Sequence, residues 1–230
     1  MDGILNINKP KGITSHDVVS AIRGIIGERR VGHTGTLDPI ATGVLLLCVG
    51  RATKLSRFLT NCKKTYVADM KLGAKTDTQD STGAVTVSCS DYSIDEKRVA
   101  DAFLKFTGDI RQTPPMYSAA KHKGVRLYTL ARKGITVERK TKDVHIYKIK
   151  LLGASHEFIR FEAEVSPGTY IRTLCEQIGD ELGCYGHLYE LQRTVIGDFK
   201  IRDAVSIEDV DMMCKSGRLS SILTPAHSIN

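Results

Sequence analysis

One carboxylate near the start of the chain has surroundings that suit chemistry. The segment from Gly32 to Leu45 reads GHTGTLDPIATGVL and contains a single acidic residue, Asp38. It leads into an apolar run over residues 43–49 that predicts a buried strand. Loops held by rigid elements commonly carry function, so Asp38 is a candidate nucleophile, general base or metal ligand. The alternative is an aspartate that caps the turn before Pro39, because Asp-Pro is a frequent turn pair.

Three other side chains could take part in chemistry. Arg172 lies in the first turn of a helix expected over residues 169–182, off its apolar stripe. A guanidinium there could hold a carboxylate or a phosphate with two hydrogen bonds, although the pattern alone favours a surface arginine. Tyr66 alternates with the apolar residues of a strand, so it points inward and is either a core tyrosine or a stacking surface. His33 could stack on a base or stabilise the loop by hydrogen bonding.

Other kinds of site have weak support. Asp77 and Asp80 are the only close acidic pair in a loop, and they lack the glycine and distal glutamate of a calcium loop. We expect them to form Asx turns. The six cysteines contain no Cys-x-x-Cys pair, so the sequence predicts reduced thiols, mostly buried, and no structural zinc.

The charge of the chain is segregated. The whole sequence holds 33 Lys and Arg against 26 Asp and Glu, a net charge of +7. Residues 111–150 hold eleven basic and two acidic residues (+9), and residues 1–65 hold ten and four (+6). Cations that neutralise phosphates, interleaved with aromatic side chains, favour a nucleic-acid partner. The aromatic residues of the more basic segment are Tyr117, His122, Tyr128 and Tyr147.

Neither a membrane nor an export signal is evident. No apolar run approaches the roughly 18 residues of a membrane helix. The N-terminus lacks the basic start and apolar core of a signal peptide. We therefore expect a cytoplasmic protein.

The elements that must position these residues mix helix and strand patterns without βαβ alternation. This favours an α+β fold with a mixed, largely antiparallel sheet. We expect one catalytic domain over residues 1–205, with a loop over 28–42, and a short helical tail over 206–230. Three expected helices are located by their caps: one begins after Thr14 or Ser15, one begins at a capping box of Ser93 with Glu96 and ends at Gly108, and one begins after Ser206. Three more are expected over residues 53–59, 127–133 and 169–182. The expected strands cover residues 43–49, 65–72, 144–152, 158–165 and 187–195.

Six short motifs then occur in order from about Gly3 to Phe199. Together they resemble the TruB family of bacterial tRNA pseudouridine synthases. The motifs are the Asp38 segment, Lys64-Thr65-Tyr66, the run from Gly73 to Asp80, the run from Pro114 to Ala119 with Lys121 and Gly124, the run from Pro167 to Arg172, and Leu191-Gln192-Arg193-Thr194.

The resemblance implies a pseudouridine synthase fold and isomerisation of the uridine at position 55, in the TΨC arm of tRNA. It implies that no cofactor or metal is needed. By position, Asp38 matches the family's nucleophile, Arg172 the arginine paired with it, and Tyr66 the tyrosine that stacks on the target base. His33 matches the histidine linked with displacing the base. Tyr170 and Leu191 match residues that line the uridine pocket.

The basic segment, about residues 111–143, matches an insertion that grips the RNA arm. The sequence departs from many members at the C-terminus, where a small RNA-binding domain of the PUA type is expected to be missing. We expect a monomer without an obligate protein partner. Two alternatives stay open: an RNA-folding helper that opens and releases tRNA arms, and a synthase that depends on a guide RNA.

Overall fold

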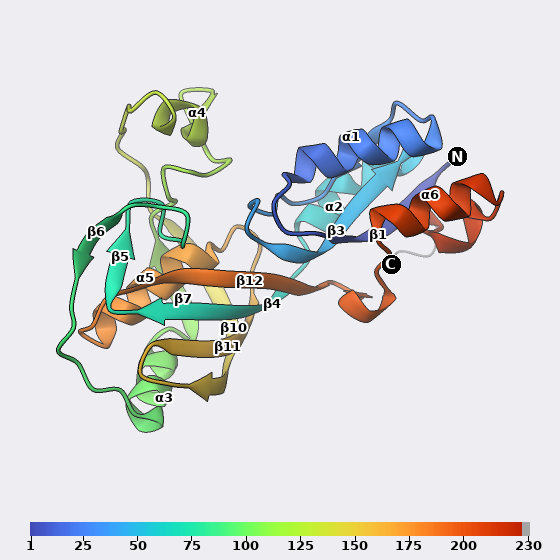
Figure 1. Ribbon diagram of the computed structural model, residues 1–230. Helices are drawn as coiled ribbons and strands as arrows, with labels where there is room; N and C mark the ends of the chain where they lie inside the picture. Colours follow the sequence, from blue (N-terminus) through green and yellow to red (C-terminus); the bar gives the residue numbers. More distant parts are fainter. Residues whose placement is uncertain (227–230) are drawn as a thin grey trace. The chain divides into compact units, whose positions relative to one another are not determined.

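The computed structural model describes residues 1–226, and the chain forms two compact units. The first unit contains residues 1–66 and the residues from 192 onwards, and the second contains residues 67–191. Strands β4 (Lys64–Leu72) and β12 (Gly186–Ile196) each run through both units (Figure 1). Of the expected tail over 206–230, residues 227–230 lie outside the described part of the chain.

The first unit is a mixed sheet with helices. Its strands follow the order β14-β1-β3-β12-β4, with β2 beside β3 and β13 beside β12. Strands β3 and β12 are parallel, whereas β1, β2 and β14 run antiparallel to their neighbours. Its other elements are β1 (Gly3–Lys9), α1 (Ser15–Ile26), β2 (Val31–His33), β3 (Thr42–Val49), the 3-10 helix η1 (Gly50–Leu55), α2 (Ser56–Thr60), β13 (Phe199–Lys200), η2 (Ile201–Asp203), α6 (Ile207–Lys215), η3 (Leu219–Ile222) and β14 (Leu223–Thr224).

Strand β3 is buried on both faces, which explains its continuous apolar sequence. Alternate residues of β1 and β3 enter two separate core clusters. The first cluster joins these strands to α1, α6 and η3 and contains Leu5, Ile7, Val18, Val19, Ile22, Val31, Leu45, Leu47, Val49, Val210 and Leu219. The second contains Ile4, Val44, Leu46, Cys48, Ala52, Leu59 and Ile196.

The helix ends of the first unit follow the expected capping chemistry. Thr14 caps α1, its side chain accepting from the backbone of Asp17 in a capping box, and Gly27 ends the helix at a φ of 67°. Ser206 caps α6 through a second capping box with Asp209. Helix α6 packs beside α1, so α6 and η3 form part of the first unit's core (Figure 1).

The second unit contains the larger antiparallel region. Its strands follow the order β12-β4-β11-β10-β7, and α3 contacts both β10 and α5. The rings of Phe103 and Phe161 meet edge to face at 5.5 Å and join α3 to the sheet. Its remaining elements are β5 (Ala74–Thr76), β6 (Val85–Ser88), α3 (Glu96–Lys105), β7 (Gly108–Gln112), β8 (Lys121–His122), β9 (Val125–Arg126), α4 (Leu127–Ala131), β10 (Lys142–Ala154), β11 (Phe158–Val165) and α5 (Ile171–Glu181).

The expected α+β fold with a mixed, largely antiparallel sheet is confirmed, with differences at individual elements. The capping box of Ser93 with Glu96 is wrong: the side chain of Asp95 accepts from the backbone of Arg98 and caps α3. The expected helix over 53–59 is divided into η1 and α2. Strands β1 and β7 were not predicted from the sequence, and β2 lies inside the expected loop over 28–42.

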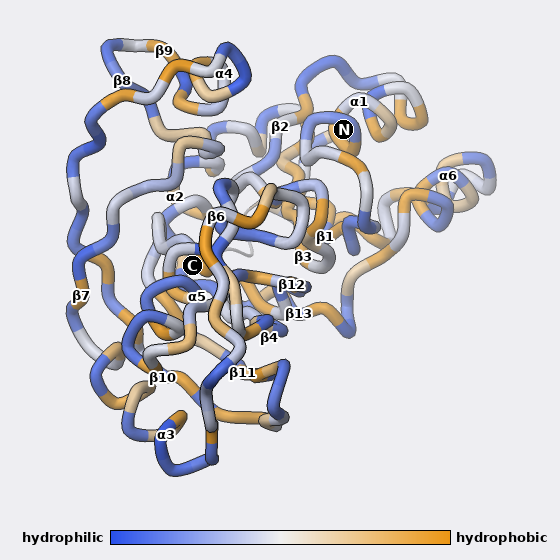
Figure 2. Tube along the Cα trace, turned by 60° about the vertical axis from the view of Figure 1, so that its left-hand side comes forward, coloured by the Kyte–Doolittle hydropathy of each residue, from blue (hydrophilic) through white to orange (hydrophobic). Residues whose placement is uncertain are grey.

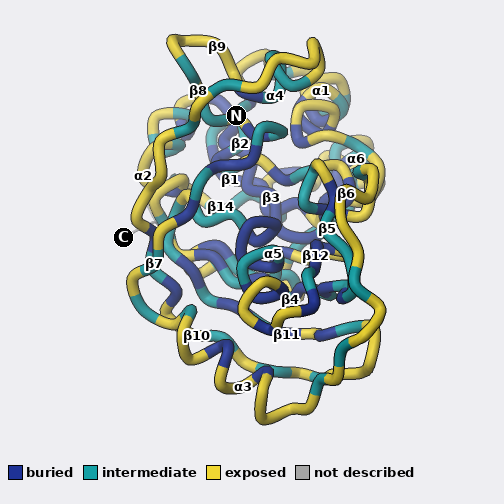
Figure 3. The backbone as a smooth tube through the Cα atoms, turned by 90° about the vertical axis from the view of Figure 1, so that its left-hand side faces the viewer, coloured by how far each residue is buried: buried dark blue, intermediate teal, exposed yellow. Residues whose placement is uncertain are grey.

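The basic segment forms an exposed projection of the second unit. The short hairpin of β8 and β9 turns at Lys123 and Gly124, both at positive φ, and α4 follows it. Hydrophilic and hydrophobic residues alternate over this segment (Figure 2), and most of the hairpin is exposed (Figure 3). Such a surface has the composition expected for contact with RNA.

The structure shows the state of the cysteine thiols and the length of the helices. All six thiols are free; Cys48, Cys175 and Cys184 are buried and the other three partly buried. Burial raises the pKa of the Cys48 thiol to about 11, which keeps that thiol protonated and unreactive. Within residues 1–226, no helix is long and apolar enough to cross a membrane.

Candidate active site

Asp38 is half-buried in the loop between β2 and β3, and both of its neighbours are fixed. Ser15 Oγ accepts a hydrogen bond from the Leu37 amide at 2.8 Å and donates one to the Leu37 carbonyl at 3.1 Å. The Pro39 carbonyl accepts from the Gly12 amide at 2.8 Å. The aspartate is therefore carried by a backbone that the start of α1 holds on both sides.

Three buried cations lie in the same unit, and backbone carbonyls bind all of them. Lys9 Nζ donates to the carbonyls of Pro10 and Ile13 at 2.8 and 2.7 Å. Lys64 Nζ donates to two carbonyls of the α2–β4 connection at 2.8 and 2.7 Å. Arg193 donates to the carbonyl of Gly35 in the Asp38 loop and to that of Val44 in β3.

The charges of Lys9 and Asp38 influence each other. Burial lowers the pKa of Lys9 to about 8, while the negative charge of Asp38 raises it and the guanidinium of Arg193 lowers it further. Burial and the charge of Arg193 likewise lower the pKa of Lys64 to about 8. Positive charge near a carboxylate favours its ionised form, which a nucleophile needs.

His33 and Tyr66 also belong to the first unit. His33 is the last residue of β2, pairs with Leu47 of β3 and lies five positions before Asp38. Tyr66 is buried on β4 together with Ala68 and every second residue beyond it, as the alternating pattern predicts. Its inward orientation is thus confirmed.

The expected exposure of Arg172 is wrong. Arg172 lies in the first turn of α5 and is only 5% exposed. Its guanidinium donates to the carbonyls of Thr78 and Tyr117 at 3.0 and 2.7 Å, and Nη1 lies 3.6 Å from Asp80 Oδ2. The whole first turn of α5 is buried, so an apolar stripe does not report which of its residues face solvent.

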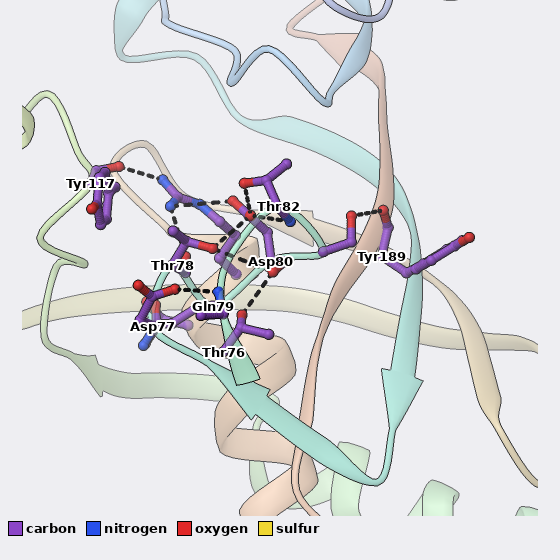
Figure 4. A network of polar contacts seen from close by, with 12 residues as sticks. Thr76, Asp77, Thr78, Gln79, Asp80, Thr82, Tyr117 and Tyr189 are labelled. Carbon is purple, nitrogen blue, oxygen red and sulfur yellow. Dashed lines mark hydrogen bonds and ion pairs between the residues drawn. The ribbon is translucent and has the colours of Figure 1, made fainter. Parts of the chain in front are cut away.

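Asp80 organises the loop that covers this arginine (Figure 4). Its Oδ1 accepts from the hydroxyls of Thr78 and Thr82 at 2.8 and 2.6 Å and from the Thr82 amide at 3.0 Å. The expected Asx turn is confirmed at Asp80, whereas Asp77 accepts from the more distant Ala84 amide. A second function of Asp80 is the buried ion pair with Arg172.

Tyr170 and Leu191, the last two expected site residues, belong to the second unit. Tyr170 is half-buried directly before α5, and the side-chain amide of buried Gln112 bonds both its backbone amide and its carbonyl, at 2.9 and 3.2 Å. Leu191 is buried on β12. Of the six expected site residues, His33, Asp38 and Tyr66 belong to the first unit and Tyr170, Arg172 and Leu191 to the second.

Sequence reasoning missed the residues that support these groups. Lys64 stands on the same alternating face as Tyr66, so that period already signals its burial. Ser15 follows the helix cap and Arg193 lies in a strand, and neither position carries a local signal. The arrangement supplies a restrained carboxylate in the first unit and a restrained guanidinium in the second, which are groups suited to nucleophilic catalysis with electrostatic support.

Comparison with known proteins identifies the family. Residues 23–171 match the model of the TruB family pseudouridylate synthase N-terminal domain, and residues 172–229 match that of the tRNA pseudouridylate synthase B C-terminal domain. The chain is 45% identical to tRNA pseudouridine synthase B of Geobacillus thermodenitrificans, over 98% of this chain and 77% of the relative. It is 47% identical to the enzyme of that name from Clostridium kluyveri, over 92% and 73%.

Solved structures share the fold. A chain of a Cbf5-Nop10-Gar1 complex superposes with a TM-score of 0.77 at 29% identity, over 97% of this chain and 60% of that chain. A chain of an H/ACA RNP bound to a substrate RNA containing 2'-deoxyuridine gives 0.73 at 26% identity, over 97% and 59%. The chain thus spans about 60% of the length of these structural relatives. Since both family models and close relatives cover nearly all of it, the chain belongs to the TruB family of tRNA pseudouridine synthases, which isomerise uridine to pseudouridine.

Proposed function

We propose that this enzyme converts the uridine at position 55, in the TΨC arm of tRNA, and that Asp38 is its nucleophile. The observation that carries the proposal is Asp38 itself: it is the single acidic residue of its loop, its two neighbours are held by hydrogen bonds, and its charge interacts with a buried lysine. Membership of the family supplies the class of substrate.

The reaction sets clear requirements. The C1′–N1 bond of the uridine must break, the uracil must rotate and a C1′–C5 bond must form. The proton on C5 must leave to solvent and N1 must take up a proton, so that the product is an isomer of the substrate. Asp38 acts in its ionised form, either on the sugar or on the base ring or first as a base. Arg172 pairs with the aspartate in this proposal and stabilises charge that develops during the reaction. No cofactor or metal takes part.

The target base must first leave the folded arm, at a cost of a few kcal/mol. We assign displacement of the base to His33 and stacking on the flipped uracil to Tyr66, which replaces part of the lost stacking. Tyr170 and Leu191 line the pocket that keeps the free base in place and water out. The burial of Tyr66 and Leu191 supports such an apolar lining.

The exposed hairpin of β8 and β9, with α4, grips the RNA arm. The ring of Tyr128 lies 5.9 Å from the guanidinium carbon of Arg126 and 5.5 Å from that of Arg132, so two cations lie beside one aromatic ring. Cations of this kind bind phosphates while the ring can stack on a base. In this proposal the protein acts as a monomer on tRNA in the bacterial cytoplasm, without a guide RNA or an obligate protein partner.

The test maps the product on an unmodified tRNA transcript. Purified enzyme is incubated with the transcript alone, and pseudouridine is located by carbodiimide modification and primer extension. We expect one stop that reports position 55 and none on a matched transcript with cytidine there. A product elsewhere would contradict the proposed position, and conversion only after a guide RNA is added would contradict the stand-alone enzyme.

A further inference from the structure

Among residues 1–226, Arg193 is the largest fully buried side chain, yet the reaction does not require it directly. It extends from β12 toward the Asp38 loop. Its Nε donates to the Val44 carbonyl at 2.8 Å and its Nη2 to the Gly35 carbonyl at 3.0 Å. Gly35 lies in the loop three residues before Asp38, and Val44 lies in β3 six residues after it, so one guanidinium joins the loop to the strand that follows.

The backbone of Arg193 holds the same loop. Gly43 lies opposite Arg193 in the parallel pairing of β3 with β12. Gly43 has a φ of +98°, and a Cβ built on it would lie 2.2 Å from the Arg193 carbonyl oxygen. Position 43 therefore requires glycine for β3 to approach Arg193 this closely. The backbone and the side chain of Arg193 together restrain the connection between the Asp38 loop and β3.

The charge of Arg193 is unusual for a core position. Buried charges are ordinarily paired, because a carbonyl dipole replaces lost hydration less well than a carboxylate does. Within residues 1–226, Arg193 makes no ion pair with a carboxylate, and its charge lowers the pKa values of both Lys9 and Lys64. An unfavourable arrangement of this kind is characteristic of functional sites.

We propose that Arg193 is the positioning residue of the nucleophile, tying the Gly35 carbonyl to the Val44 carbonyl so that Asp38 is held in its reactive place. The inference rests on the proposed role of Asp38. A planar guanidinium spans two acceptors in a fixed geometry that an ammonium group cannot reproduce. A displacement of about 1 Å at a reacting group can reduce a rate on the order of 100-fold, and Arg193 acts against such displacement.

The test compares Arg193→Lys and Arg193→Gln with the unchanged enzyme. Single-turnover tritium release from carbon-5-labelled uridine in a tRNA transcript gives the rate of the chemical step, and filter binding gives the Kd for tRNA. We expect the rate to fall about 10- to 100-fold in both variants, with the Kd within about twofold, because Arg193 is buried and offers no surface to RNA. The retained charge of the lysine will not restore the rate.

Val210→Ala is the matched control, because Val210 is buried in the same unit on α6, in a core cluster whose residues lie outside the Asp38 loop. All proteins are assayed below the onset of their thermal unfolding. We expect the control to lose stability and keep its rate. Full rates in folded Arg193 variants, or losses equal to those of the control at matched stability, would overturn the proposal.

Asp38→Asn, measured beside them, separates the two proposals. If it retains turnover, the assignment of the nucleophile fails. If it is inactive while the folded Arg193→Lys protein works at the normal rate, only the positioning role of Arg193 fails. Should Arg193→Gln not fold, Arg193→Lys decides alone, since it keeps the buried charge and can still donate to one carbonyl.

Discussion

The two units bury positive charge in opposite ways. In the first unit, Lys9, Lys64 and Arg193 donate to backbone carbonyls. In the second unit, Arg172 also donates to two carbonyls, but Asp80 lies 3.6 Å from its guanidinium and both side chains are almost fully buried. In the first unit the three cations are bound by carbonyls, and in the second the cation is also paired with a buried carboxylate.

The difference indicates what each region contributes. Carbonyl-bound cations leave a positive potential that favours the ionised form of a nearby carboxylate, and Asp38 is the acidic residue whose charge acts on Lys9. The ion pair of Asp80 with Arg172 instead fixes the orientation of one guanidinium, because a bonded carboxylate limits the rotation of its partner. The first arrangement favours negative charge on the proposed nucleophile, and the second fixes the orientation of the arginine that we propose for the reaction.

Breaking the ion pair should have the largest effect. Arg172→Met leaves Asp80 as a buried carboxylate without its cation, so we expect a loss of stability of about 3–5 kcal/mol. We also expect a rate loss on the order of 10²- to 10³-fold, because a charged group is removed from the proposed site. Urea unfolding and single-turnover tritium release measure the two effects.

The double variant Arg172→Met with Asp80→Leu sharpens this comparison. Without a stranded charge, stability should recover in part while the rate stays low. Recovery of the rate together with stability would show that the pair has only a structural function, and Arg172 would lose its proposed role.

A smaller effect is expected where the loop meets α1. Ser15→Ala removes both hydrogen bonds to Leu37, at a cost of about 1–2 kcal/mol, and should slow the chemical step several-fold because the residue before Asp38 is released. Thr14→Ala is the adjacent control: it removes the helix cap at a cost of about 1 kcal/mol and does not touch the loop. Equal rates for the two variants at equal stability would contradict the claim that Ser15 positions the loop.

The smallest effect is a pH dependence of stability. The unfolded chain protonates lysine with a pKa of 10.5, whereas Lys9 and Lys64 have pKa values of about 8 in the folded protein. Between these limits the unfolded chain binds protons that the folded protein does not, so the free energy of unfolding increases with pH. From pH 8 to 9 each lysine should contribute about 1 kcal/mol.

The measurement is made between pH 8 and 9 because ionisation of thiols lowers the free energy of unfolding at higher pH. The Cys48 thiol has a pKa of about 11 in the folded protein, so stability falls as the unfolded thiol ionises from about pH 9. Lys64→Met should remove about half of the increase between pH 8 and 9, measured by denaturant unfolding at each pH. An unchanged slope in Lys64→Met would mean that Lys64 is charged throughout the interval.

The sequence predicts a large part of the fold and the burial of Tyr66, but little of what supports the expected site residues. The alternation over β4 predicted that Tyr66 is buried, and the same period extends to Lys64. Arg172 was expected at the surface because helical periodicity describes one packed face, while the first turn of α5 is buried on all sides. The guanidinium bridge of Arg193 depends on a parallel pairing of β3 with β12, residues about 150 positions apart, which local pattern does not report.

The central claim is that a restrained Asp38 is the nucleophile of the isomerisation. Asp38→Asn tests it most directly, with tritium release and tRNA binding measured on the same preparation as the unchanged enzyme. The account predicts release by the unchanged enzyme, none by Asp38→Asn, and similar tRNA binding by both. Release by folded Asp38→Asn at a comparable rate would contradict it.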